Sequence, residues 1–196
     1  MNDALAGAFA DASRFLVEVV ALVPATAWDE PGLDRWTMRD LVGHANRSHT
    51  LVEEYLLRPQ PPEPPDSPYF SADAIAARGR EAAAALGDDP AAVVRAASDA
   101  AIALVGRTGP EAVIGSPMGS MSLHAYLPSR IAELTIHGLD IARAAHSGLV
   151  PPPAALRESL AFTAVIAAQR GGPEAGVTAL LALSGREALP PGFSVY

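Results

Sequence analysis

A row of four polar side chains is the feature of this chain best suited to chemistry. They are Arg130, Glu133, His137 and Asp140, in the segment SRIAELTIHGLDIARA. A helix turns about 100° per residue, so spacings of three, four and three residues place all four on one narrow face. The other residues of the segment are mostly apolar, which is typical of a helix inside a protein, where unpaired polar groups are costly. These side chains therefore need one another, or a metal ion, as partners.

A second segment, WTMRDLVGHANRSH, places His44 near the middle of another expected helix. Glu133 and His137 have the i, i+4 spacing with which one helix offers two ligands to the same cation. If the two helices pack side by side, His44 can reach the same point. Two imidazoles and one carboxylate then form a set of three protein ligands, which leaves room for water or substrate.

Neighbouring polar residues could support such a site. Asp40, one turn before His44, or Asp140 could orient an imidazole by accepting a hydrogen bond from its second N–H. Arg130 could balance the charge or hold an anionic group of a substrate. His49 lies about 140° further round the helix than His44 and should face a different target. We expect the remaining histidines on the surface or in loops: His49, His124 and His146.

The same residues have simpler interpretations, which the sequence leaves open. Glu133 and His137 could form a structural ion pair with Arg130. Asp40 could be the partner of Thr37 in a capping box at the start of a helix. We expect two tryptophans to anchor the connection between the first two helices in the core: Trp28 and Trp36.

Composition excludes several classes of protein. The chain has 196 residues, enough for one domain with a substantial core, and its formal net charge is −8. Scattered arginines without a basic cluster argue against a nucleic-acid surface. No apolar run approaches the ~20 residues of a membrane span, and the N-terminal segment MNDALAGAFADASRF lacks the features of a signal peptide. We therefore expect a cytoplasmic protein.

Two missing residue types narrow the chemistry. The sequence contains no cysteine, which excludes disulfides, cysteine nucleophiles and thiolate zinc sites. It also contains no lysine, which excludes Schiff-base chemistry and the phosphate-binding lysine of P-loops. Any enzyme built from this chain depends on histidine, carboxylate, hydroxyl or arginine groups, or on a metal.

Apolar periodicity predicts an all-α fold. Thr37 with Asp40, and Asp89 with Pro90, mark two helix starts, and the proline-rich segment RPQPPEPPDSP is typical of an extended crossover. We expect helices over 3–23, 38–57, 71–86, 90–106, 128–146 and 153–170, with a short helix in the tail. The segment 107–126 should be a loop with one short extended piece. The architecture is an up-down four-helix bundle with long crossover loops and an extra C-terminal helix.

Two segments, in order along the chain, resemble one known family. W-T-x-R-D-L-V-x-H at 36–44 and R-x-x-E-L-x-I-H-G-x-D-I-A-x-A at 130–144 resemble the mycothiol-dependent maleylpyruvate isomerase family, which lies within the DinB-like superfamily of metal-binding four-helix bundles. The resemblance runs from about residue 8 to 146, and the segment LLALSGREALPPGF resembles the family's usual ending. It implies that His44 is the first histidine ligand and that Glu133 and His137 are the E-x-x-x-H pair.

The resemblance also implies cofactors and a domain organisation. It implies a divalent metal, with zinc the first choice, and a low-molecular-weight thiol such as mycothiol as cosubstrate. Full isomerases of the family carry a further small α/β domain, for which 196 residues leave little room. We therefore expect residues 1–196 to form a single helical domain of the N-terminal type.

A metal-bound thiol would suit a chain that has no thiol of its own. Coordination lowers the pKa of a thiol strongly, and the resulting thiolate could add to an electrophilic carbon of a small-molecule substrate. Thiol transfer or isomerisation would follow, with Arg130 and Asp140 as candidate catalytic residues.

Other functions fit the same residues. One is a non-catalytic helical module that binds a metal or ligand, and another is a metal-dependent hydrolase in which bound water attacks. The composition, with 18% charged residues and a mean hydropathy of +0.18, predicts a buried face and hence a homodimer.

Overall fold

The computed structural model describes residues 3–64, 66–170 and 172–194, and within these ranges the chain is predominantly helical. The α-helices are α1 (Asp3–Ala21), α2 (Met38–Leu57), α3 (Ala72–Ala84), α4 (Pro90–Arg107), α5 (Leu123–Ala144), α6 (Pro153–Arg170) and α7 (Gly172–Leu183). Short strands are β1 (Pro31–Leu33), β2 (Trp36–Thr37), β3 (Val113–Ser116) and β4 (Gly119–Ser122), and η1 (Pro68–Phe70) is a 3₁₀ turn. The predicted all-α fold is confirmed.

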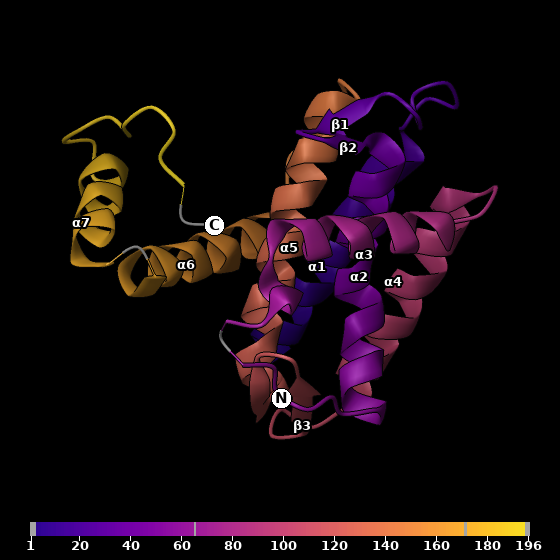
Figure 1. Ribbon diagram of the computed structural model, residues 1–196, viewed down its shortest axis with the longest axis horizontal. Helices are drawn as coiled ribbons and strands as arrows, with labels where there is room; N and C mark the ends of the chain where they lie inside the picture. The colour runs from indigo at the N-terminus through magenta and orange to yellow at the C-terminus, as the bar shows by residue number, and fades with distance from the viewer. Residues whose placement is uncertain (1–2, 65, 171, 195–196) are drawn as a thin grey trace.

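Four of the helices enclose the core as a bundle (Figure 1). In cyclic order α1 packs on α4, α4 on α2, α2 on α5 and α5 on α1. Each helix turns large apolar side chains inward, among them Phe9, Leu16, Leu41, Leu127 and Ile131, which are all at least 98% buried. Burial of this apolar surface is the main force that holds the helices together.

The two hairpins lie at opposite ends of the bundle and fix the helix directions. The antiparallel pair β1–β2 joins the end of α1 to the start of α2. At the other end, Gln60, just beyond α2, donates a backbone hydrogen bond of 2.9 Å to Gly115 of β3. Since β3 follows α4, the helices α2 and α4 run in the same direction, and α2 and α5 are antiparallel. The proline-rich crossover and α3 return the chain between α2 and α4.

Helix α2 begins as its sequence indicates. The Thr37 hydroxyl accepts from the Asp40 backbone N–H, and the Asp40 carboxylate accepts from the Thr37 N–H, both at 3.2 Å. This reciprocal pair satisfies two amides that the first helical turn leaves free. The capping-box interpretation of Asp40 is confirmed.

The start of α5 differs from the expectation. The segment 107–126 contains the hairpin β3–β4 rather than one extended piece, and α5 begins at Leu123 rather than at about 128. The Ser122 hydroxyl accepts from the Ala125 N–H at 3.2 Å and caps the helix. Pro128 therefore lies inside α5, where it was expected near the first turn. Proline is common in the first turn of a helix, so Pro128 indicated a start near 128, although Ser122 is the residue that caps the helix.

Beyond the bundle, α6 and α7 form an arm that projects from α5 (Figure 1). The helix expected over 153–170 and the short helix expected in the tail are both present, as α6 and α7. Helix α6 packs on α5, whereas α7 packs mainly on α6. A groove of about 640 Å³ runs between the arm, the tail and Ile136 of α5. None of the described helices has the length and hydropathy needed to cross a bilayer.

The helix α3 lies close against α2 at Gly43. A Cβ atom at Gly43 would overlap the backbone nitrogen of Ala83 and lie 2.7 Å from its Cα. We expect Gly43→Ala to lower the free energy of unfolding by about 1–3 kcal/mol, because backbone must move. Gly7→Ala is the matched control: its Cβ would meet nothing within 4 Å, and alanine should stabilise α1 by about 0.5–1 kcal/mol. Urea unfolding of both variants tests this, and equal effects would contradict the close packing.

The predicted homodimer would form through the arm. No described residue of α7 is buried, and Leu180 and Leu183 are 67% and 68% exposed. The segments α6 and α7 carry two arginines and two glutamates, so their charges balance. Because the whole chain has a net charge of −8, two copies would repel each other less through this segment than through an acidic one. We expect sedimentation to show a dimer at micromolar concentration and Leu180→Glu with Leu183→Glu to yield a monomer of unchanged thermal stability. A monomeric wild-type protein would contradict the prediction.

Candidate metal centre

Three ligand-competent side chains meet on the seam between α2 and α5. His44 comes from α2, while Glu133 and His137 lie one turn apart on α5. The Glu133 Oε2 atom lies 3.6 Å from His44 Nε2 and 3.4 Å from His137 Nε2. One ligand atom from each residue lies within 4.8 Å of the others, and all three side chains are partly buried. We refer to these three residues as the triad.

The spacing of the triad suits a shared cation better than direct hydrogen bonds. N–H···O hydrogen bonds are about 2.7–3.2 Å long. Donors bonded at about 2.0–2.2 Å to one tetrahedral ion lie about 3.4 Å apart, close to the separations of the triad. In addition, His44 Nε2 faces the Glu133 carboxylate, and His44 Nδ1 has no hydrogen-bond partner among the described residues, so no other polar group of those residues orients this imidazole. The residues present therefore fit a divalent metal.

Asp140 holds the imidazole of His137. Its Oδ2 lies 3.2 Å from His137 Nδ1, which leaves Nε2 directed at Glu133. Burial alone would lower the pKa of His137, but the interactions with Asp140 and Glu133 outweigh it and raise the pKa to about 9. A carboxylate on the outer nitrogen of a ligand histidine fixes its orientation and raises its basicity.

The two other triad members have pKa shifts in the opposite direction. Burial opposes ionisation of Glu133, yet the two imidazoles and Arg130 together hold its pKa well below the usual range. Burial is the largest influence on His44 and lowers its pKa. In the metal-free protein, the negative charge of Glu133 is thus shared between an imidazolium at 137 and a neutral imidazole at 44.

The structural alternative for these residues, an ion pair with Arg130, does not form. No ion pair between Arg130 and Glu133 occurs within 4.0 Å among the described residues. Instead, Arg130 Nε donates to the Ser129 hydroxyl at 3.2 Å, and the guanidinium lies 5.0 Å from the ring centroid of Tyr126. The Asp40 carboxylate forms the capping box, and within the described ranges it has no hydrogen bond or ion pair with His44, whereas Asp140 contacts the imidazole of His137.

Trp36 covers the triad, a role that the sequence did not reveal. Its ring centroid lies 4.5 Å from that of His44 and 6.4 Å from that of His137. The ring is only partly buried, and it packs against the core as expected. Gly79 of α3 lies against it, since a Cβ there would be 3.5 Å from the Trp36 ring and 3.7 Å from His44 Cβ. The signal available was the position of Trp36 immediately before the capping box of α2.

The expectation that His49 lies on the surface is wrong. Its side chain is 99% buried in the bundle, with Nδ1 3.0 Å from the Asn46 amide oxygen. Burial lowers its pKa to about 3 and keeps it neutral. Its spacing from Leu41, Val42, Ala45 and Val52 on the inner face of α2 was the available signal. As expected, the other two histidines are exposed: His124 and His146.

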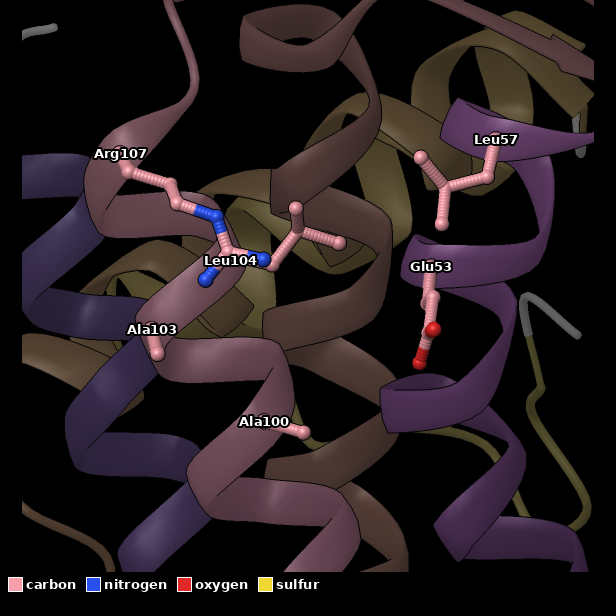
Figure 2. A pocket seen from close by; sticks show the side chains of 6 residues that line it. All are labelled: Glu53, Leu57, Ala100, Ala103, Leu104 and Arg107. Atoms are coloured by element: carbon pink, nitrogen blue, oxygen red, sulfur yellow. The ribbon is translucent and has the colours of Figure 1, made fainter.

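Two grooves of the molecule lie away from the triad, and one is the groove beside the arm described above. A groove of about 150 Å³ lies between α2 and α4, where Glu53 and Leu57 face Leu104 and Arg107 (Figure 2). Its lining offers neither a histidine nor a second carboxylate, so it has no metal-binding set. The chemistry is therefore concentrated on the α2–α5 seam.

The fold and the site together define a class of protein, the four-helix bundles in which side chains from neighbouring helices form a candidate metal centre. The family model of the mycothiol maleylpyruvate isomerase N-terminal domain matches residues 9–142. The chain belongs to this family. The matched range includes all of the triad and the bundle apart from the first residues of α1 and the last two of α5, but not the arm. No curated protein and no solved structure gave a significant match.

The raised pKa of His137 predicts how the metal-free protein responds to pH. Because the folded value is about 9 and the unfolded value about 6.5, the stabilisation is fully present below pH 6.5 and is lost as the pH rises through 9. We expect the free energy of unfolding to fall by on the order of 1–3 kcal/mol from pH 6 to pH 9.5. Urea unfolding of the chelator-treated protein measures it.

The control for this experiment is the exposed His124. His137→Gln should remove most of the pH dependence, whereas His124→Gln should retain it. A pH dependence that survives in His137→Gln would show that the imidazole at 137 does not hold its proton in this way.

Proposed function

We propose that the protein is a metal-dependent enzyme that uses a low-molecular-weight thiol, of the mycothiol type, for thiol transfer or isomerisation of a small electrophilic substrate. The observation that supports this most is the geometry of His44, Glu133 and His137 in a chain without cysteine. Membership of the isomerase family supports the thiol.

The triad would hold the metal with three protein ligands. Two imidazoles and one carboxylate are suited to zinc, and three ligands leave a position for an exogenous group. When bound there, a divalent cation lowers the pKa of a coordinating thiol, so that thiolate is available at neutral pH. The protein itself supplies no competing thiol, because it has no cysteine.

The reaction proposed is addition of the thiol to a carbon–carbon double bond conjugated to a carbonyl. A sulfur–carbon bond forms as the sulfur–hydrogen bond breaks, and the proton goes to the neighbouring carbon or to solvent. Rotation about the resulting single bond and elimination reverse both changes, return the thiol and leave the isomerised substrate. Without elimination, the product is the thiol adduct, which is the transfer reaction.

The residues around the triad would position these groups. Asp140 keeps His137 in the orientation that directs Nε2 inward. Trp36 packs against both imidazoles and limits their rotation. Arg130 offers a positive charge one turn from Glu133, where it would hold an anionic group of the substrate.

Metal analysis tests the first half of the proposal. We expect protein purified without chelator to contain about one equivalent of zinc, and His44→Ala or Glu133→Ala to lose it. His124→Ala is the matched control, since its imidazole is exposed and lies more than two turns of α5 before Glu133. Zinc retained in His44→Ala, or absent from wild-type protein after incubation with zinc, would contradict the site.

Activity tests the second half. Zinc-loaded wild-type protein should consume a small thiol in the presence of unsaturated carbonyl compounds, and His44→Ala should be slower by at least about a hundredfold, in line with the loss of a metal-activated nucleophile. Stoichiometric zinc without thiol-dependent turnover of any electrophile would favour the non-catalytic binding module instead.

A further inference from the structure

Two arginines beside the triad have no carboxylate partner. Arg47 follows His44 by three residues on α2, and Arg130 precedes Glu133 by three residues on α5. Both side chains are partly buried, yet among the described residues neither takes part in an ion pair. A partly buried guanidinium without a counter-charge is costly, so this pair indicates that an anion belongs nearby.

The helix directions bring the two arginines to the same stretch of the seam. One end of this stretch is the triad, and the other is the contact between the rings of Tyr55 and Tyr126, whose centroids are 6.0 Å apart. Because α2 and α5 are antiparallel, Arg47 lies between these contacts on one helix and Arg130 lies between them on the other. Like charges that approach across a helix seam repel, unless an anion lies between them.

Tyr126 connects the two charges. Its ring lies 5.0 Å from the Arg130 guanidinium, and its hydroxyl has no hydrogen-bond partner among the described residues. Burial raises the pKa of Tyr126, and Glu133 and Tyr69 add to the rise, while Arg130 and Arg47 oppose it, so the fields of both arginines reach this hydroxyl. Because its pKa is raised, the hydroxyl is protonated at neutral pH and is available as a donor beside Arg130.

We propose that Arg47, Arg130 and Tyr126 form an anion subsite that binds the carboxylate of a short organic acid beside the triad. Guanidinium groups bind carboxylates through paired, charge-assisted hydrogen bonds, and the phenol can donate one more. Three residues of helix separate each arginine from the triad, which is about 5 Å along the axis. A ligand that spans both sites therefore carries its carboxylate about 5 Å from the atom that reacts.

The role of this subsite in substrate selection rests on the proposed function, but its binding of an anion does not. The first experiment therefore uses metal-free protein and succinate, followed by NMR or calorimetry, with neutral succinamide as the matched ligand. We expect succinate to bind, succinamide to bind at least tenfold more weakly, and added salt to weaken only the succinate complex. Arg47→Gln and Arg130→Gln should each weaken succinate binding at least fivefold.

Two further variants separate binding from folding. Arg143→Gln removes an exposed arginine from the last turn of α5 and should bind succinate as the wild type does. Arg47→Lys retains the charge without the paired donors, so it should bind with intermediate affinity even if Arg47→Gln folds poorly. Equal binding of succinate and succinamide, no binding of succinate, or equal losses in Arg143→Gln and Arg47→Gln would each overturn the subsite.

A second arm identifies which reactant supplies the carboxylate. In zinc-loaded protein, 3-mercaptopropionate is compared with 3-mercaptopropionamide, and succinate is titrated with and without the amide thiol. If the thiol supplies the carboxylate, Arg47→Gln weakens the acid thiol selectively; if the electrophile supplies it, succinate binds together with the amide thiol. Loss of zinc binding with succinate binding intact would refute the proposed function and leave the anion subsite in place.

Discussion

The carboxylate of Glu133 between two imidazoles is the constraint on which the site depends. The Nε2 atoms of His44 and His137 approach the same Glu133 oxygen from different helices, at 3.6 and 3.4 Å. These distances are longer than ordinary hydrogen bonds, yet short enough for strong electrostatic interaction. Buried polar groups are normally satisfied, and at these separations the three side chains satisfy one another only weakly. A cation bound by His44 Nε2, His137 Nε2 and the Glu133 carboxylate would remove this deficit.

The bundle is built to keep α2 and α5 in this relationship. The capping box at Thr37 and Asp40 fixes where α2 begins, and thereby the height at which His44 faces α5. Glycines at close contacts allow the neighbouring helices to approach, as where a Cβ at Gly138 would lie 2.6 Å from the Phe15 ring. Trp36 and α3 then close the outer side. The candidate ligands and the ring of Trp36 beside them thus come from segments that are separate in sequence.

Much of this could be predicted, because helical geometry converts spacing directly into position. The spacings of Glu133, His137 and Asp140 place them on one face of any helix, and Asp40 is recognisable from its distance to Thr37. What could not be predicted depends on partners distant in sequence. The depth of His49 depends on which face of α2 meets the core, and the position of Trp36 over His44 depends on the hairpin β1–β2. Likewise, the sequence gives no measure of how far α6 and α7 project.

X-ray absorption at the zinc edge, with and without a saturating small thiol, tests the central claim most directly. Zinc-loaded protein alone should show a shell of only nitrogen and oxygen atoms at about 2.0–2.1 Å, with two imidazoles. Added thiol should introduce one sulfur at about 2.3 Å. Because the chain has no cysteine, a thiolate ligand can come only from the added thiol. A shell that lacks two imidazoles, or one that remains free of sulfur at saturating thiol, would contradict the account.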